Sequence, residues 1–268
     1  MKRPVPPHRR GSQRIPLAGR RNVVLRLIGG ASAVVLAGCD KISQSVWGPK
    51  VLDTAEAVNF EVQRALTSKT ALAQEFSESD LSPTFRSNGT ADPDDAGYQR
   101  HVQTQFRDWK LRVDGLVRTP AELSLAELRA MKSRTQITRH DCVEGWSAIA
   151  QWTGVPLGEI LSRVGPASTV RYVVFHCADP MDESGTRYYE SIGLDDAHHP
   201  QTILAYALNG KPLPVANGAP VRVRVERQLG YKMAKYIMRI ELVESFEHIG
   251  GGYGGYWEDQ GYEWYAGT

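Results

Sequence analysis

The sequence predicts an α+β domain built from strands and short helices. The segment Val170–His176 is rich in β-branched and aromatic residues, which is typical of a buried strand. The pattern Ser124-Leu-Ala-Glu127 is a capping box that opens a short helix to about Lys132. Strand and helix patterns alternate along the chain and no internal repeat is visible, so we expect one mixed domain.

The remaining elements follow from the spacing of apolar residues. Helical spacing predicts a helix, or two, within Asp53–Gln74, and Trp109–Val113 alternates as a strand. Asp114-Gly115 is a hairpin signal, which predicts that the chain returns through Leu116-Val117. Further predicted strands are Gln136–His140, Tyr188–Ile192, Val221–Val225 and Ile237–Val243; further predicted helices are Trp146–Trp152 and Leu157–Val164; Ser77–Tyr98 is a predicted loop.

The segment His248–Thr268 combines seven glycines with six Tyr or Trp residues. Flexible low-complexity segments avoid such large rings, which are stabilised by burial. We therefore expect this tail to pack against the domain.

Charge is distributed unevenly over the 268 residues, whose formal net charge is +2. Residues 1–38 hold eight of the 32 basic residues and no acidic one, which leaves 24 basic against 30 acidic residues from Cys39 onward. The acidic body argues against a nucleic-acid-binding domain. A hydrophobic fraction of 41% with 23% charged residues also excludes a disordered chain and an integral membrane bundle.

The first 38 residues have the order of an export signal. Arg20-Arg21 precedes an apolar stretch, Leu27–Ala37, that is too short to cross a bilayer. The pair resembles a twin-arginine signal, although Val23 and Val24 replace the usual Phe and Leu, and Leu36-Ala37-Gly38-Cys39 resembles a bacterial lipobox. A plain secretory signal or a basic tail is the alternative. We predict a signal over 1–38, a linker over 39–52 and a domain over 53–268.

The two cysteines of the body, Cys142 and Cys177, allow three interpretations. An exported protein commonly pairs two cysteines in a disulfide. A zinc site with His140 and His176 has poor ligand spacing. A functional thiolate at Cys142 is the third, because Arg139 and His140 lie within three residues and a cation lowers the pKa of a thiol. A soft thiolate favours soft or high-valent metals.

Several separated blocks resemble the sulfite-oxidase family of molybdopterin enzymes. The signature is Thr138–Ser147 (TRHDCVEGWS) followed by Trp152–Leu157 (WTGVPL). The resemblance extends over Trp109–Leu128, Tyr172–Ile192 and Asn217–Lys235, and so covers most of residues 80–245. Within that family, the sequence is most similar to the periplasmic branch that includes the catalytic subunit of a methionine-sulfoxide-reducing system. The resemblance implies a sulfite-oxidase-like fold with mixed sheets and short helices.

The resemblance also implies a cofactor and its ligands. Cys142 matches the cysteine that ligates molybdenum, together with one molybdopterin, and Arg139 and His140 beside it are candidate catalytic residues. The predicted cofactor contacts are Asn88, Cys177, Asn217, Arg222, Met233, Ala234 and Lys235. The family more often has Thr where this chain has Cys177. Cations and amides of this kind suit a phosphorylated pterin.

We therefore expect an exported oxidoreductase that transfers an oxygen atom to or from a small S- or N-oxide, with reduction favoured. Sulfite oxidation at the same site is one alternative, and a non-catalytic lipoprotein with a Cys142–Cys177 disulfide is another. Sulfite oxidases with a dimerisation domain continue well beyond Thr268, so we expect a monomer. The sequence has no C-x-x-C-H haem motif, so we expect it to work with a membrane-bound haem or quinone-linked electron-transfer partner. Asp40 after a lipidated Cys39 is typical of a periplasmic protein held at the inner membrane. Tyr188, Tyr189 and the aromatic tail are candidate pocket residues.

Overall fold

The computed structural model describes residues 68 and 70–268, and the account below concerns these residues. The predicted export signal over 1–38, Cys39, the linker over 39–52 and most of the helix predicted within Asp53–Gln74 lie outside them. The described end of that helical prediction, residues 70–74, is a turn followed by irregular chain, so the prediction is wrong there. No helix in the described part is long and apolar enough to cross a membrane.

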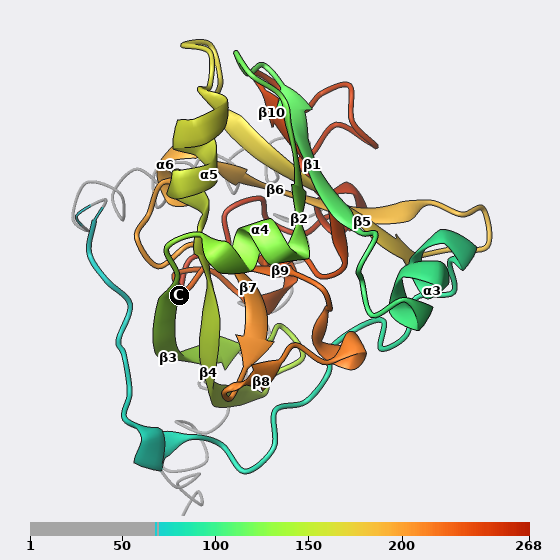
Figure 1. Ribbon diagram of the computed structural model, residues 1–268. Helices are drawn as coiled ribbons and strands as arrows, with labels where there is room; N and C mark the ends of the chain where they lie inside the picture. Colours follow the sequence, from blue (N-terminus) through green and yellow to red (C-terminus); the bar gives the residue numbers. More distant parts are fainter. Residues whose placement is uncertain (1–67, 69) are drawn as a thin grey trace, which may run out of the picture. The chain divides into compact units, whose positions relative to one another are not determined.

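Two five-stranded sheets form the framework (Figure 1). The first has the order β2-β1-β10-β5-β6 and is mixed, since β1 runs parallel to β10 and its other pairs are antiparallel. The second has the order β3-β4-β7-β8, with β9 also paired to β7, and is antiparallel. The strands are β1 Lys110–Gly115, β2 Ala121–Ser124, β3 Arg134–Asp141, β4 Ser147–Pro156, β5 Tyr172–Pro180, β6 Arg187–Gly193, β7 Ile203–Leu208, β8 Lys211–Pro212, β9 Arg222–Arg224 and β10 Ile237–Val243.

Short helices connect the strands, as predicted for an α+β domain. They are α3 Ala96–Gln103, α4 Leu125–Ala130, α5 Leu157–Val164 and α6 Leu194–Ala197, with the 3-10 turns η1 Glu78–Asp80, η2 Val215–Asn217, η3 Gly230–Lys232 and η4 Glu258–Gln260. The main core takes side chains from both sheets, among them Leu111, Val155 and Ile240. The two sheets therefore share one hydrophobic interior.

The elements with strong local signals are confirmed. Ser124 and Glu127 form both hydrogen bonds of the capping box that begins α4. The predicted helix Leu157–Val164 and strand Ile237–Val243 have the observed bounds of α5 and β10. The other predicted strands correspond to β1, β3, β5, β6 and β9.

Two predictions are wrong because contacts distant in sequence decide the structure. Asp114-Gly115 is not a turn: β1 continues through it, and the antiparallel partner is β2. Gly115 is needed because a Cβ there would lie 2.4 Å from the Leu242 carbonyl oxygen of β10. The segment predicted as the helix Trp146–Trp152 is strand β4 from Ser147, with Ala148, Ala150 and Trp152 buried at a period of two.

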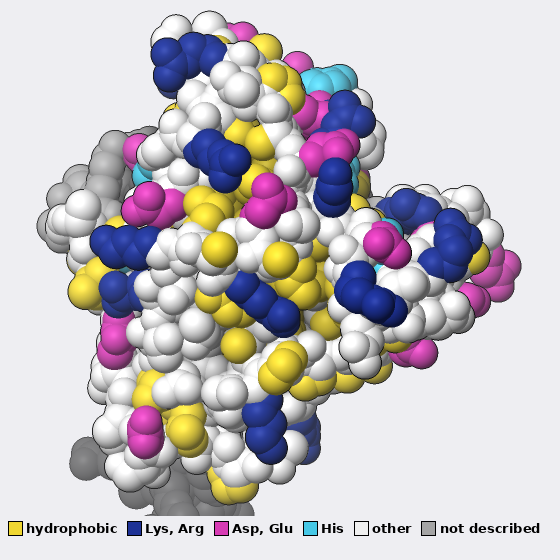
Figure 2. Space-filling view, viewed as in Figure 1, with side chains coloured by type: hydrophobic (Ala, Val, Ile, Leu, Met, Phe, Trp, Pro, Cys, Tyr) yellow, Lys and Arg dark blue, Asp and Glu magenta, His cyan; other side chains and the backbone are white. Residues whose placement is uncertain are grey.

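Charged side chains of both signs are mixed on the face of the described residues that is seen in Figure 2. Lys and Arg side chains are interspersed there with Asp and Glu, and hydrophobic side chains lie between them. A nucleic-acid-binding face would instead gather its basic side chains into one stripe.

Candidate active site

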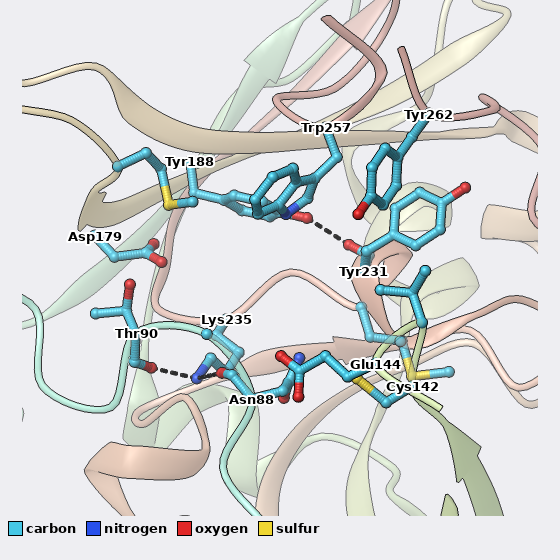
Figure 3. Close-up of a pocket in the computed structure, with 15 residues that line it drawn as sticks. Asn88, Thr90, Cys142, Glu144, Asp179, Tyr188, Tyr231, Lys235, Trp257 and Tyr262 are labelled. Atoms are coloured by element: carbon cyan, nitrogen blue, oxygen red, sulfur yellow. Dashed lines mark hydrogen bonds between the residues drawn. The ribbon is translucent and has the colours of Figure 1, made fainter. Parts of the chain in front are cut away.

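A cavity of about 300 Å³ lies where six separate parts of the chain meet. Figure 3 shows aromatic rings along one side and polar groups of Asn88, Thr90 and Lys235 along the other. The lining consists of Asn88, Gly89, Thr90, Cys142, Val143, Glu144, Asp179, Met181, Tyr188, Gly230, Tyr231, Met233, Lys235, Trp257 and Tyr262. Such a cavity can hold a flat organic group between an apolar wall and a polar floor.

Cys142 lies at the tip of the hairpin between β3 and β4. Its backbone N–H donates to the Trp146 carbonyl at 2.9 Å, and the Gly145 N–H donates to the Cys142 carbonyl at 3.0 Å. Gly145 has a φ of +84°, a conformation that favours glycine. This tight turn fixes the Cys142 side chain at the edge of the cavity.

The expectation that neighbouring cations lower the pKa of Cys142 is wrong. Burial raises that pKa, because a thiolate is poorly solvated there. Arg139 lies on the opposite face of β3, exposed and paired with Asp141 at 2.9 Å, and it does not line the cavity. His140 is buried, and burial together with the Arg224 charge holds its pKa well below the usual value, so its ring is neutral.

His140 does not line the cavity but packs against residues that do. Its Nδ1 accepts a hydrogen bond from Arg224 Nη1 at 2.8 Å and lies 3.3 Å from Met233 Sδ. A Cβ added to Gly230 would come within 2.5 Å of the His140 ring, so the imidazole packs directly on η3. Arg224 is itself neutralised, since Glu226 accepts two hydrogen bonds from it, at 2.9 and 2.6 Å.

Two other cations lack a negative partner. Arg222 is fully buried, and it donates only to the backbone carbonyls of Asn217, at 3.2 Å, and Met233, at 3.1 Å. Lys235 Nζ donates to the carbonyls of Asn88, at 2.6 Å, and Thr90, and to a third carbonyl. Neither forms an ion pair with a carboxylate of the described residues.

The electrostatic cost of these two cations is visible in their pKa values. Burial and then the Arg224 charge lower the pKa of Arg222 to about 9. Burial and then the Arg222 charge lower the pKa of Lys235 to about 7. Buried charges normally have a counter-charge. The pair therefore forms a site that an anion would complete.

Unpaired polar atoms surround the same two cations. Asn88 Oδ1, Asn217 Nδ2 and Arg222 Nε are buried without a hydrogen-bond partner. Gly218, at φ +108°, brings the backbone close to Lys235, because a Cβ there would lie 2.9 Å from the Lys235 Cβ. The donor set fits a phosphate ester with hydrogen-bonding groups nearby.

The other predicted cofactor residues are placed as follows. Met233 lines the cavity, and the Ala234 carbonyl accepts from the Val223 N–H of β9 at 3.0 Å. Cys177 is buried in β5 beside the cavity but does not line it. Cys142 and Cys177 are both free thiols, so the structural disulfide of the non-catalytic alternative is not formed.

Part of the predicted pocket is confirmed by the aromatic side of the cavity, called the aromatic wall below, which consists of Tyr188, Tyr231, Trp257 and Tyr262. Tyr188 and the tail residues Trp257 and Tyr262 line the cavity, whereas Tyr189 does not and instead bonds to Asp259. The tail packs on the domain as expected: Lys232 Nζ contacts Glu190 at 2.5 Å and also Glu258, all three side chains being buried. This triad joins η4 of the tail to β6 and η3.

Sequence reasoning missed Glu144, Tyr231 and Asp179. Glu144 accepts from Trp146 Nε1 at 2.9 Å and projects from the turn that carries Cys142. The signal for Asp179 was available, because an acidic residue within an apolar strand is rarely buried without a partner or a function. Tyr231 had no distinguishing local pattern.

Comparisons with known proteins identify the family of the chain. The model of the family "oxidoreductase molybdopterin binding domain" matches residues 98–248. The chain is 37% identical over 256 residues to a protein of Azospira oryzae assigned as protein-methionine-sulfoxide reductase subunit YedZ1, covering 95% of this chain and 90% of that one. It is 45% identical over 146 residues to the protein-methionine-sulfoxide reductase catalytic subunit MsrP of Xanthomonas campestris pv. campestris, covering 51% of this chain and 45% of that one.

Two further matches are more distant or shorter. The MsrP catalytic subunit of Ralstonia nicotianae is 37% identical over 179 residues, and this chain spans 54% of its length. Among solved structures, the sulfane dehydrogenase SoxCD from Paracoccus pantotrophus superposes with a TM-score of 0.46 at 20% identity, covering 52% of this chain and 39% of that one. The chain thus spans nearly all of one relative and about half of the MsrP proteins that it matches.

Proposed function

Because the chain belongs to the oxidoreductase molybdopterin binding domain family, the family of sulfite oxidase, we propose that it reduces small S-oxides or N-oxides at a molybdenum–molybdopterin site. Membership makes the chain a molybdopterin-binding oxidoreductase. The substrate class, the direction of the reaction and the ligands of the metal are the parts that we infer.

One observation carries the proposal: two buried cations without counter-charge lie beside a cavity with a cysteine at its edge. Arg222 and Lys235 would bind the phosphate of the cofactor, assisted by the unpaired Nδ2 of Asn217. The thiol of Cys142 would ligate the metal, and a bound metal would offset the burial that raises its pKa. When bound, molybdenum supplies two-electron oxygen-atom transfer.

The surrounding residues control access and geometry. Trp257 and Tyr262 cover one side of the cavity and would exclude water while contacting the organic part of a substrate. His140 acts as a positioning residue, since its ring packs against η3 and Met233 rather than into the cavity. Arg139 would act only at long range, because its side chain lies on the outer face of β3.

The names of the relatives favour reduction of a sulfoxide. The YedZ1 and MsrP proteins are named as subunits of protein-methionine-sulfoxide reductases. Reduction of a sulfoxide consumes two electrons and two protons, and it yields a thioether and water. The word subunit supports an electron-transfer partner, which we propose to be a membrane-bound haem or quinone-linked protein.

We further propose a periplasmic location with the chain anchored to the inner membrane through lipidated Cys39. The support is in the sequence: a twin-arginine segment suits a protein that receives its cofactor before export, and the lipobox follows it. Incorporation of a radiolabelled fatty acid tests the anchor. The label should be lost in Cys39→Ser, and a labelled Cys39→Ser protein would contradict it.

Metal analysis and a substrate panel test the function. The chain purified from a cofactor-competent host should contain one molybdenum, which Cys142→Ser loses and the control Cys177→Ser retains. With an artificial electron donor it should reduce sulfoxides or N-oxides. Oxidation of sulfite without any oxide reduction would instead establish the sulfite oxidase alternative, and a molybdenum-free protein would refute both.

A further inference from the structure

Asp179 occupies an irregular end of strand β5. The pairing of β5 with β6 breaks between His176 and Pro180, and its pairing with β10 shifts opposite the same region. Cys177, Ala178 and Asp179 are all buried, at 3%, 1% and 4% exposed, so both faces of this end of the strand are covered. The bulge therefore turns the Asp179 side chain into the cavity, which it lines.

The Asp179 carboxyl group is only partly satisfied: a hydrogen bond with the Thr90 side chain helps to stabilise its charged form. Its Oδ1 is buried with no hydrogen-bond partner. Lys235 is nearby, but its ammonium group is occupied by backbone carbonyls and forms no ion pair with Asp179. The Tyr188 hydroxyl donates to the Tyr231 carbonyl instead (Figure 3).

The ionisation state of Asp179 increases its need for hydrogen-bond donors. Burial raises the pKa of Asp179 to about 6, and a backbone hydrogen bond, the Lys235 charge and the hydrogen bond with Thr90 partly oppose that rise. The titratable groups that face it are Lys235, the thiol of Cys177 and the phenols of Tyr98, Tyr188 and Tyr236. At neutral pH the group is mostly a carboxylate, and an unpaired oxygen of a buried carboxylate calls for N–H donors.

We propose that Asp179 binds the heterocycle of the cofactor, its carboxylate accepting hydrogen bonds from a ring N–H and the adjacent exocyclic amino group. This inference rests on the proposed function. A pterin carries such donors side by side, and a carboxylate matches them with two oxygens. The aromatic wall that includes Tyr188 and Trp257 faces the same space and suits a flat ring.

The position of Asp179 argues against a role in proton delivery. Figure 3 shows Asp179 at the end of the cavity opposite Cys142, whereas a proton donor must lie within hydrogen-bond reach of the reacting atoms. The two ends of the cavity thus have separate tasks, with the metal at Cys142 and the ring edge at Asp179.

Cofactor content tests the inference without relying on activity. Asp179→Asn and Asp179→Leu, purified from a cofactor-competent host, should retain about tenfold less pterin, measured as its fluorescent oxidation product, and less molybdenum than wild type. The exposed Asp182→Asn in the following turn is the control. In the cofactor-free state Asp179→Asn should melt no lower than wild type, because it removes an uncompensated charge.

Binding of a small probe keeps the inference testable if the variants fail to fold. The cofactor-free wild-type chain should bind 6-hydroxymethylpterin about tenfold more tightly than the analogue methylated on the ring nitrogen and the amino group. Equal binding of the two probes, or variants that retain full cofactor, would overturn the role of Asp179. Wild-type protein without any pterin would overturn the proposed function and this inference together.

Discussion

Removing the charge of Lys235 should abolish a specific pH dependence of stability. Burial, followed by the Arg222 charge, lowers the pKa of this lysine from its usual 10.5 to about 7. The unfolded chain therefore holds the proton more tightly, and the free energy of unfolding of the cofactor-free protein rises with pH between those values. One pKa unit corresponds to ~1.4 kcal/mol, so the full rise approaches ~5 kcal/mol and about 2 kcal/mol is gained from pH 7 to pH 9.

The measurement is urea unfolding of cofactor-free protein at pH 7 and pH 9. Lys235→Met keeps the apolar part of the side chain and should lose the rise of about 2 kcal/mol. Lys211→Met, which changes an exposed lysine on β8, should keep it. Cofactor-loaded wild type should also lack the rise, because a bound phosphate restores the pKa of Lys235. A Lys235→Met protein that still gains stability as wild type does would refute the uncompensated charge.

Three further substitutions test other contacts. Gly230→Ala places a methyl group 2.5 Å from the His140 ring and should destabilise the protein by about 1–3 kcal/mol and reduce bound molybdenum, whereas Gly158→Ala, whose Cβ meets nothing closer than 3.5 Å, should not. Lys232→Met leaves two buried glutamates without their cation, so it should cost about 3–5 kcal/mol in urea unfolding and expose the tail to limited proteolysis. Ser124→Ala removes the cap of α4 and should lower the stability by about 1 kcal/mol without changing cofactor content, and an unchanged melting temperature would contradict the role of the cap.

The predictable parts of the fold are those set by neighbouring residues. The cap at Ser124 and the amphipathic pattern of α5 act within one helix, and both were predicted correctly. The segment that begins at Trp146 contains residues compatible with a helix, yet β3 and β7 pair with it on both sides and impose a strand. Gly115 resembles a turn glycine, but its role is the close approach of β10.

In the site too, the features that depend on distant contacts could not be predicted from local sequence. Resemblance predicts Arg222, Lys235 and Cys142 as site residues, but the charge balance around them depends on contacts between distant segments. Arg139 is close to Cys142 in sequence and lies on the other face of the strand, so adjacency gave a wrong pKa direction. The direction of the Asp179 side chain depends on a bulge that no local pattern announces.

The aromatic wall sets the time at which the cavity can exist during synthesis. The lining begins at Asn88 and is not complete until Trp257 and Tyr262 have joined it. Nearly the whole of the described chain must therefore leave the ribosome before the cavity closes around its contents. A cofactor that needs the complete cavity would therefore bind after synthesis, and the ion triad at Lys232 marks the packing of the tail that completes the lining.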